Sequence, residues 1–93
     1  FAANDMMAIG CLASLTQAGL SVPGDIALAG FDDIPISRYV TPALTTVRVP
    51  IVELGTLALE ELASAIEKPD HPGGKQHTLR AELVARQSCA RSA

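Results

Sequence analysis

The feature that most constrains the fold is a continuous apolar run over residues 25–31, Asp-Ile-Ala-Leu-Ala-Gly-Phe, followed directly by an acidic pair. A run that does not alternate with polar residues is typical of a strand covered on both faces, as in a parallel sheet. A helical pattern over residues 4–19 precedes it. A helix followed by a buried strand is half of a βαβ repeat, so the sequence predicts an α/β fold with parallel strands flanked by helices.

The first predicted helix, residues 4–19, carries start and stop signals. Asn4 or Asp5 can accept hydrogen bonds from the free N–H groups of the first turn, and Gly19 suits the left-handed position after the last turn. Apolar residues occupy much of the helix circumference. We therefore expect two of its faces to be covered.

Further elements are expected along the rest of the chain. A short helical turn around residues 36–39 lies between two prolines, and the β-branched stretch 44–49 predicts extended structure. Pro50 fits the first position of a second helix over residues 50–67, which has an apolar stripe on one side. The prediction ends with a Pro/Gly connector at 69–76, a short strand at 79–84 and a frayed polar tail from Gln87 onward.

Composition sets limits on function. The 93 residues form at most one domain, and a net charge of −3 argues against a nucleic-acid surface, which needs clustered Lys and Arg. Cys11 and Cys89 lack metal-site spacing; two free thiols in a reducing cytoplasm is the simpler interpretation, with a disulfide as the alternative. No apolar run approaches the ~20 residues of a membrane span. The chain begins at Phe1 without Met, directly before a helix, so we expect further sequence upstream.

The acidic pair Asp32-Asp33 is the sharpest candidate for a binding function. In open α/β sheets ligands bind beyond the carboxyl ends of the strands, where this pair is expected. An ionised Asp only accepts hydrogen bonds, which suits a ligand rich in hydroxyl or N–H donors. Alternatively, both residues shape the turn and cap the short helix that follows; we favour this for Asp33, and for Asp32 both interpretations stay open. Asn4 is likewise either a ligand contact or a simple helix cap.

A catalytic interpretation finds little support. Paired aspartates can hold Mg²⁺ for phosphoryl transfer, but such a site needs further carboxylates and a cationic or nucleophilic partner. The chain contains no GxxxxGK[ST], GxSxG or HExxH motif, and His71 and His77 lie in or beside the polar connector. We therefore expect no enzyme activity, no metal site and no cofactor. Tyr39 is expected on the surface or in a subunit contact.

Five ordered blocks of the sequence carry a family resemblance. They are Ala-Asn-Asp-Met-Met-Ala-Ile-Gly from residue 3, Gly-Leu-x-Val-Pro-x-Asp-Ile from 19, Gly-Phe-Asp-Asp from 30, Pro-Ala-Leu-Thr-Thr-Val from 42 with Pro50 and Leu54-Gly55, and Leu-Val-x-Arg-x-Ser from 83. Together these blocks resemble the LacI/GalR family of bacterial repressors. They cover nearly the whole chain up to Ser88. The resemblance implies the C-terminal third of an effector-binding core, part of a two-lobed fold like that of periplasmic binding proteins.

The resemblance also implies a division of the chain between lobes. Residues 1–47 would belong to the C-terminal lobe, residues 48–78 would cross to the N-terminal lobe, and a strand within residues 79–88 would return. Residues 89–93 would form a tail. The family's helix-turn-helix DNA-binding domain, its hinge helix and the rest of both lobes have no counterpart in these residues.

Particular residues acquire implied roles from the matching blocks. Asn4 and Asp32 fall on effector-contacting positions, and Ile51 matches a position that often lines the pocket, where some relatives carry an aromatic residue. The family's dimer surface maps onto the first helix and onto residues 36–41. Its members here include Met6, Ile9, Gly10, Ile36, Tyr39 and Val40.

The resemblance therefore implies the effector-sensing and dimerisation part of a cytoplasmic transcriptional regulator. Its partners would be a small metabolite such as a sugar, a second copy of the chain, and operator DNA reached only through the helix-turn-helix, with no membrane association. The alternative is part of a periplasmic sugar-binding transport protein, which shares the fold; an upstream helix-turn-helix or a secretory leader would distinguish the two. A Mg²⁺-dependent hydrolase ranks third.

Overall fold

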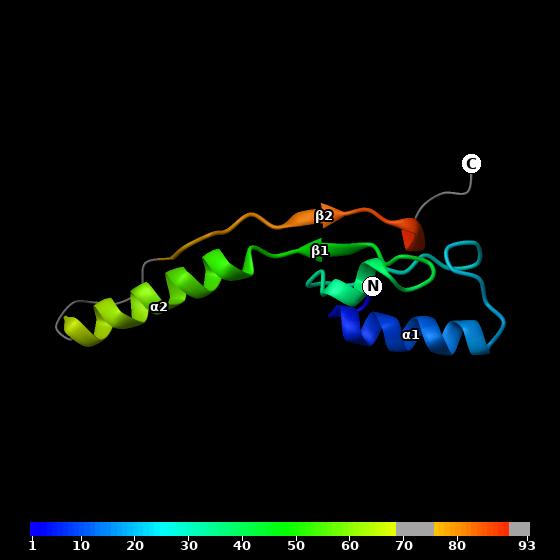
Figure 1. Cartoon of the computed structure of the whole chain (residues 1–93), viewed down its shortest axis with the longest axis horizontal. Helices are drawn as coiled ribbons and strands as arrows, with labels where there is room; N and C mark the ends of the chain where they lie inside the picture. Colours follow the sequence, from blue (N-terminus) through cyan, green and yellow to red (C-terminus); the bar gives the residue numbers. More distant parts are fainter. Residues whose placement is uncertain (69–75, 90–93) are drawn as a thin grey trace. The chain divides into compact units, whose positions relative to one another are not determined.

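The computed structural model describes residues 1–68 and 76–89. Its elements in chain order are α1 (Asp5–Gln17), the 3₁₀ turn η1 (Pro35–Arg38), β1 (Thr46–Arg48), α2 (Ile51–Glu67), β2 (Glu82–Val84) and the 3₁₀ turn η2 (Gln87–Cys89) (Figure 1). They form two compact units, Phe1–Val49 with Glu82–Ala93 and Pro50–Ala81, so the first unit is built from two separate stretches of chain. Most of the predicted connector, and the predicted tail beyond residue 89, lie outside the described residues.

α1 begins and ends close to where its capping signals predict. The side chain of Asn4 accepts a 2.9 Å hydrogen bond from the backbone N–H of Met7, and Gly19 adopts a left-handed φ of 80° just past the helix. Ala8 and Leu12 are buried on one side, whereas Met7 is exposed. The described residues therefore cover one face of α1, and the cover of a second face stays a prediction.

Asp25 still belongs to the preceding turn, and residues 26–31 do not form the regular strand that the apolar run predicts. The segment around them makes two single-residue parallel bridges, Ala29 with Thr45 and Asp32 with Arg48. The predicted parallel pairing is confirmed, whereas the prediction of a regular strand is wrong. The physical reason is that the neighbouring stretches are short: β1 has 3 residues, and the chain on the other side turns at once into α1, so no long ladder forms.

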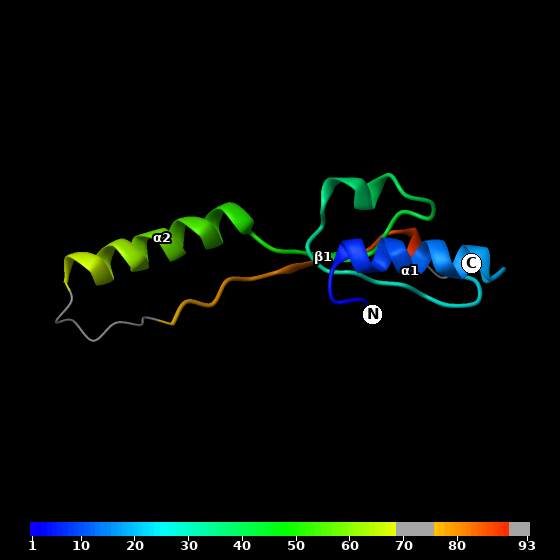
Figure 2. The same cartoon turned by 90° about the horizontal axis from the view of Figure 1, so that it is seen from below.

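The described residues bury only part of the same segment. Leu28 and Gly30 are buried, whereas Ile26 and Ala27 are exposed. Together with Ala8, Leu12 and Leu44, Leu28 makes the small apolar core of the first unit. Figures 1 and 2 together show α1 running along the extended segments of this unit, with the core residues contributed from both.

The end of the described chain is more ordered than predicted. β2 pairs antiparallel with β1, with Arg48 opposite Glu82, and η2 follows it. Ser88, within η2, has no exposed surface, and its backbone N–H donates a 2.9 Å bond to the carbonyl oxygen of Ala43. The predicted fraying is wrong for η2, because Ser88 supplies hydrogen bonds to segments that lie far away in the sequence.

The second unit consists of α2 and the chain that follows it. α2 begins after Pro50, which is its N-cap residue rather than its first helical residue. His77 Nε2 lies 3.0 Å from Glu61 Oε1, so the segment after the connector contacts the helix. No described side chain of α2 is buried, and its predicted apolar stripe lies exposed. None of the helices in residues 1–68 and 76–89 is long and apolar enough to cross a membrane.

Candidate functional site

The acidic pair lies where the extended segment turns toward η1. Both residues have left-handed backbone angles, with φ of 117° at Asp32 and 57° at Asp33. Such angles are strained for residues that carry a Cβ atom, and they gather at functional sites. The N–H of Asp32 donates a 2.9 Å bond to the carbonyl oxygen of Val47, which places Asp32 at the end of the parallel-paired segment. Open α/β sheets bind ligands at this position.

The carboxylate of Asp32 is the available acceptor of the pair. Asp32 is half-buried, and among the described residues no hydrogen bond or ion pair engages its carboxylate. Such a group can accept hydrogen bonds from the hydroxyl groups of a ligand. The left-handed backbone agrees with the turn interpretation, while the ligand contact stays a prediction.

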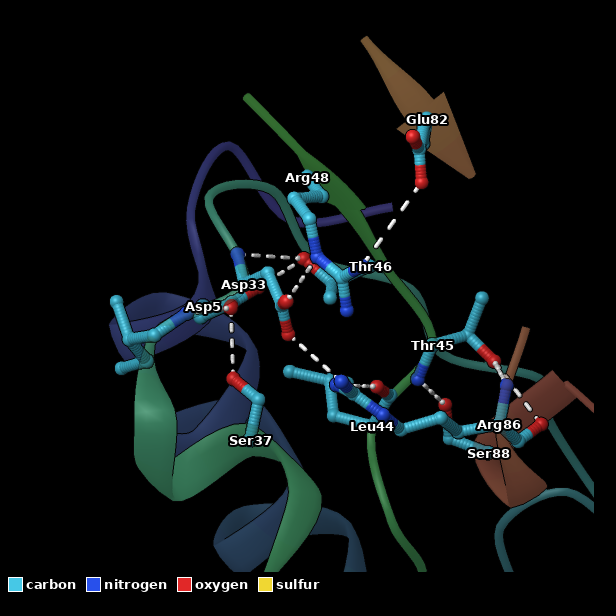
Figure 3. A network of polar contacts seen from close by, with 11 residues as sticks. Asp5, Asp33, Ser37, Leu44, Thr45, Thr46, Arg48, Glu82, Arg86 and Ser88 are labelled. Carbon is cyan, nitrogen blue, oxygen red and sulfur yellow. Dashed lines mark hydrogen bonds and ion pairs between the residues drawn. The ribbon is translucent and has the colours of Figure 1, made fainter. Parts of the chain in front are cut away.

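Asp33 lies between two arginines (Figure 3). Its Oδ2 is 2.8 Å from Arg48 Nε, its Oδ1 is 2.7 Å from Arg86 Nη2, and only 5% of the side chain is exposed. Burial by itself raises the pKa of Asp33, but hydrogen bonds from Arg48 and Arg86 and their positive charges outweigh it, so the pKa is lowered. The ionised carboxylate thus links β1 to the segment that follows β2.

The predicted role of Asp33 is correct in part. Its left-handed φ shapes the turn, but its carboxylate does not cap η1, because both oxygens are engaged by guanidinium groups. A carboxylate of α1 contacts the start of η1 instead. Asp5 Oδ2 accepts a 2.9 Å bond from the backbone N–H of Ile34, the residue just before η1.

Asp5 has a structural role that its predicted place in a helix cap does not suggest. It has no exposed surface, and its carboxylate also accepts 2.6 Å bonds from the hydroxyl groups of Ser37 and Thr46. The first turn of α1 is thereby joined to η1 and to β1. The signal in the sequence was weak, since an Asp at a helix start also suits the helix dipole.

Arg86 and Ser88 form a further group of contacts to which the sequence analysis assigned no role. Arg86 Nη1 donates a 3.0 Å bond to the carbonyl oxygen of Leu44. The hydroxyl of Ser88 donates to the carbonyl oxygen of Leu28 (2.5 Å) and accepts from the N–H of Thr45 (2.8 Å). The available signal was the Leu-Val-x-Arg-x-Ser block, in which both residues are part of the resemblance.

The other two predicted effector contacts, Asn4 and Ile51, lie in different units. The Oδ1 atom of Asn4 caps α1, which confirms the capping alternative and leaves its amide NH₂ group for a ligand. A 2.9 Å bond from the N–H of Asp5 to the carbonyl oxygen of Phe31 brings Asn4 and Asp32 to the same end of the extended layer. Ile51 is the exposed first residue of α2. Contact of these side chains with an effector stays a prediction.

The predicted dimer surface is exposed at most of its members. Met6, Ile36 and Tyr39 are 67%, 50% and 73% exposed, and Gly10 is exposed as well. Ile9 and Val40 are half-buried because both pack against the core of the first unit. A contact between two copies through this surface stays a prediction.

The Mg²⁺ interpretation of the acidic pair gains no support. Within residues 1–68 and 76–89, no group of three or more His, Cys, Asp or Glu side chains is arranged to hold a metal ion. Asp33 is engaged by Arg48 and Arg86, so one of the two carboxylates that such a site requires is already neutralised.

Comparison with known proteins identifies the family. The family described as the periplasmic binding protein-like domain matches residues 1–89. The lactose operon repressor of Rhizobium radiobacter is 42% identical over 87 residues, which are 94% of this chain and 75% of that protein. Other curated regulators are longer, and the chain spans only 20% and 21% of the length of two of them.

Solved structures of regulators share the fold. A LacI family transcriptional regulator from Enterococcus faecalis V583 with bound ribose is 34% identical with a TM-score of 0.82, over 94% of this chain and 32% of that one. The lac repressor dimer bound to operator and the anti-inducer ONPF is 33% identical with a TM-score of 0.79, over 94% of this chain and 26% of that one. These relatives are regulators of transcription, not transport proteins or enzymes. The chain belongs to the periplasmic-binding-protein-like domain family, among the LacI/GalR-type transcriptional regulators.

Proposed function

We propose that this chain is the C-terminal part of the effector-sensing and dimerisation region of a LacI-type repressor, and that its effector is a sugar. The observation that carries the proposal is the Asp32 carboxylate, held on a left-handed turn at the end of a parallel-paired segment and engaged by no other described residue. A hydroxyl-rich ligand suits an acceptor of this kind. The ribose-bound relative supports a sugar as the class of effector.

The proposal divides the chain between the two lobes of the fold. Residues 1–47 belong to the C-terminal lobe, residues 48–78 extend into the N-terminal lobe, and residues 79–88 return. The separation of Phe1–Val49 with Glu82–Ala93 from Pro50–Ala81 supports this division. The coverage of about a third of the solved regulators supports it too, since the rest of both lobes then comes from sequence outside this chain.

The mechanism follows from differential binding. A sugar that contacts both lobes binds one lobe arrangement more tightly than the other, and it shifts the population of DNA-binding states by that difference in affinity. The described residues sense the ligand; a separate helix-turn-helix segment contacts the operator, in line with the net charge of −3 on this chain. A cytoplasmic location and a homodimer belong to the same proposal.

Replacing Asp32 by Asn tests the proposed site. In the protein that carries this chain, Asp32→Asn removes the charge at nearly constant volume. Because a hydrogen bond to a charged group contributes about 1.5–3 kcal/mol, we expect sugar affinity to fall about tenfold to a hundredfold. Isothermal titration calorimetry against D-ribose, D-galactose and lactose measures this.

The matched control is Asp25→Asn. Asp25 is an exposed aspartate whose Oδ2 accepts a bond of 2.7 Å from the neighbouring backbone N–H of Ser21. Sugar affinity should be unchanged in this control. Equal affinities for wild type and Asp32→Asn, with both proteins folded, would contradict the assignment of Asp32.

A further inference from the structure

We propose that Asp33 is a positioning residue for the sugar contact. Through its bonds to Arg48 and Arg86, it holds the backbone of Asp32 in the left-handed conformation in which the Asp32 carboxylate is presented to a sugar. This inference rests on the proposed function and concerns a residue that touches no ligand itself. It assigns the two halves of the acidic pair to different tasks, with Asp32 presenting an acceptor and Asp33 fixing where that acceptor lies.

The backbone conformation of the pair requires support. Asp32 and Asp33 have consecutive φ values of 117° and 57°, and two positive angles in succession are uncommon for residues with a Cβ atom, although Asp tolerates the left-handed region better than most. The N–H of Asp32 donates to the Val47 carbonyl at 2.9 Å, and the N–H of Asp33 reaches Thr46 Oγ1 at a long 3.3 Å. Asp5 holds the flanking residues, since its N–H donates to the Phe31 carbonyl and its Oδ2 accepts from the N–H of Ile34, both at 2.9 Å. Side-chain contacts of the pair itself add to these bonds.

The carboxylate of Asp33 supplies those contacts. Arg48 and Arg86 each bind a different oxygen, at 2.8 Å and 2.7 Å, and the side chain is almost fully buried (Figure 3). Charge-assisted bonds of this length are stronger than neutral ones and are directional. Because both oxygens are engaged, rotation of the side chain would break at least one of these bonds, which restrains the backbone that carries it.

The two arginines are themselves anchored. Arg48 is the last residue of β1 and its backbone pairs with Asp32 itself. Arg86 donates to the Leu44 carbonyl from its guanidinium group and to Thr45 Oγ1 from its backbone N–H, at 3.0 Å and 2.8 Å. Asp33 thus ties the turn to β1, through Arg48, and to the segment that follows β2, through Arg86.

The first test needs no ligand. In the protein that carries this chain, Asp33→Asn removes the negative charge and replaces one of the two acceptor oxygens, each of which binds one arginine, by an NH₂ donor. We expect amide hydrogen exchange at Asp32 to accelerate at least tenfold, while exchange at Leu12 in the core of α1 stays unchanged. Unchanged exchange at Asp32 would overturn the positioning role. Equal acceleration at the amides of Asp32 and Leu12 would overturn it too, because it would indicate a general loss of stability.

The second test measures coupling between the two aspartates. Calorimetry against the sugar that binds best among D-ribose, D-galactose and lactose should show about tenfold weaker binding for Asp33→Asn. If Asp33 acts through Asp32, the same substitution in an Asp32→Asn background causes little further loss. Additive losses would show that Asp33 acts independently of Asp32 and would reject the inference.

Two further variants complete the design. Arg48→Gln removes one of the two partners at a half-exposed side chain, so it reproduces part of the effect even if Asp33→Asn fails to fold. Glu82→Gln is the control, because Glu82 contacts Arg48 only at 3.8 Å and is largely exposed, and it should bind sugar as wild type does. Absence of binding by wild type to all three sugars would refute the proposed sugar sensing, whereas the exchange experiment still decides whether Asp33 holds the turn.

Discussion

The carboxylate of Asp5 explains at the residue scale how so small a core holds its parts together. A buried charge is costly unless hydrogen bonds replace the lost water, and Asp5 accepts three, from the backbone of Ile34 and from the hydroxyl groups of Ser37 and Thr46. In residues 1–68 and 76–89, no buried side-chain polar atom is left without a partner. Directional polar contacts therefore specify how α1, η1 and β1 meet.

Gly30 is the residue that makes room for Asp5. A Cβ atom at position 30 would overlap Asp5 Oδ1 and would lie 3.2 Å from both Ala8 Cβ and Leu44 Cδ2. We expect Gly30→Ala to lower the free energy of unfolding by about 1–3 kcal/mol, because a packed and hydrogen-bonded site cannot yield without strain. Urea unfolding of the protein that carries this chain measures the change.

Gly55→Ala is the matched control for that substitution. A Cβ atom at position 55, within α2, meets no atom within 4 Å. The same chemical change should there be neutral or should stabilise by up to about 1 kcal/mol, since Ala is the better helix former. Equal effects at the two positions would contradict a steric role for Gly30.

What the sequence predicts at this scale depends on distance along the chain. The capping bond from Asn4 to Met7 and the left-handed Gly19 are local, and both are confirmed. The partners of Asp33 are not local, since Arg86 lies 53 positions away and belongs to the other stretch of the first unit. No periodicity or motif spacing reports such a pair, so the sequence could predict the turn but not the arginines that hold it.

At the scale of elements, helices are predicted more closely than strands. Both helices fall within a few residues of their expected bounds, because caps and periodicity are properties of the segment itself. Whether residues 25–31 form a regular strand depends instead on the length of the neighbouring stretches. Hydrophobic composition alone therefore predicted the direction of pairing but overstated its regularity.

η2 is a short element with a large expected contribution to stability. Ser88→Ala removes the hydroxyl that accepts from the N–H of Thr45 and donates to the carbonyl of Leu28. Since a buried N–H then loses its partner, we expect the free energy of unfolding to fall by about 1–3 kcal/mol, measured by urea unfolding. Gln87→Ala, at the exposed neighbouring position, should change it by no more than about 0.5 kcal/mol. If Ser88→Ala lowered the free energy of unfolding by no more than Gln87→Ala does, the Ser88 hydroxyl would not contribute to stability.

At the scale of the whole chain, apolar side chains lie exposed on two helices. The described residues cover neither the outer face of α1 nor the apolar stripe of α2. The chain spans 26% and 32% of two solved regulators to which it is similar. A hydrophobic pattern records that a face is covered, but it does not say whether the cover belongs to the same stretch of sequence.

The exposed surface around Tyr39 leads to a prediction on assembly. If Met6, Ile36 and Tyr39 lie in a contact between two copies, Tyr39→Arg places charge and bulk in its centre. We expect the dimer dissociation constant to rise at least tenfold, as measured by sedimentation in the protein that carries this chain. Leu20→Arg, at another exposed apolar residue outside this surface, is the control and should leave the constant unchanged. A dimer equally stable in both variants would place the contact elsewhere.

The discontinuous first unit has a consequence for synthesis on the ribosome. Phe1–Val49 emerges first, but Arg86 and Ser88, which complete its polar contacts, are translated roughly 40 residues later, about 2–8 s at ordinary elongation rates. Throughout that interval Asp33 lacks one of its two arginines and the N–H of Thr45 lacks its acceptor. The speed at which the intervening codons are read therefore sets how long the nascent unit stays open to chaperones and proteases.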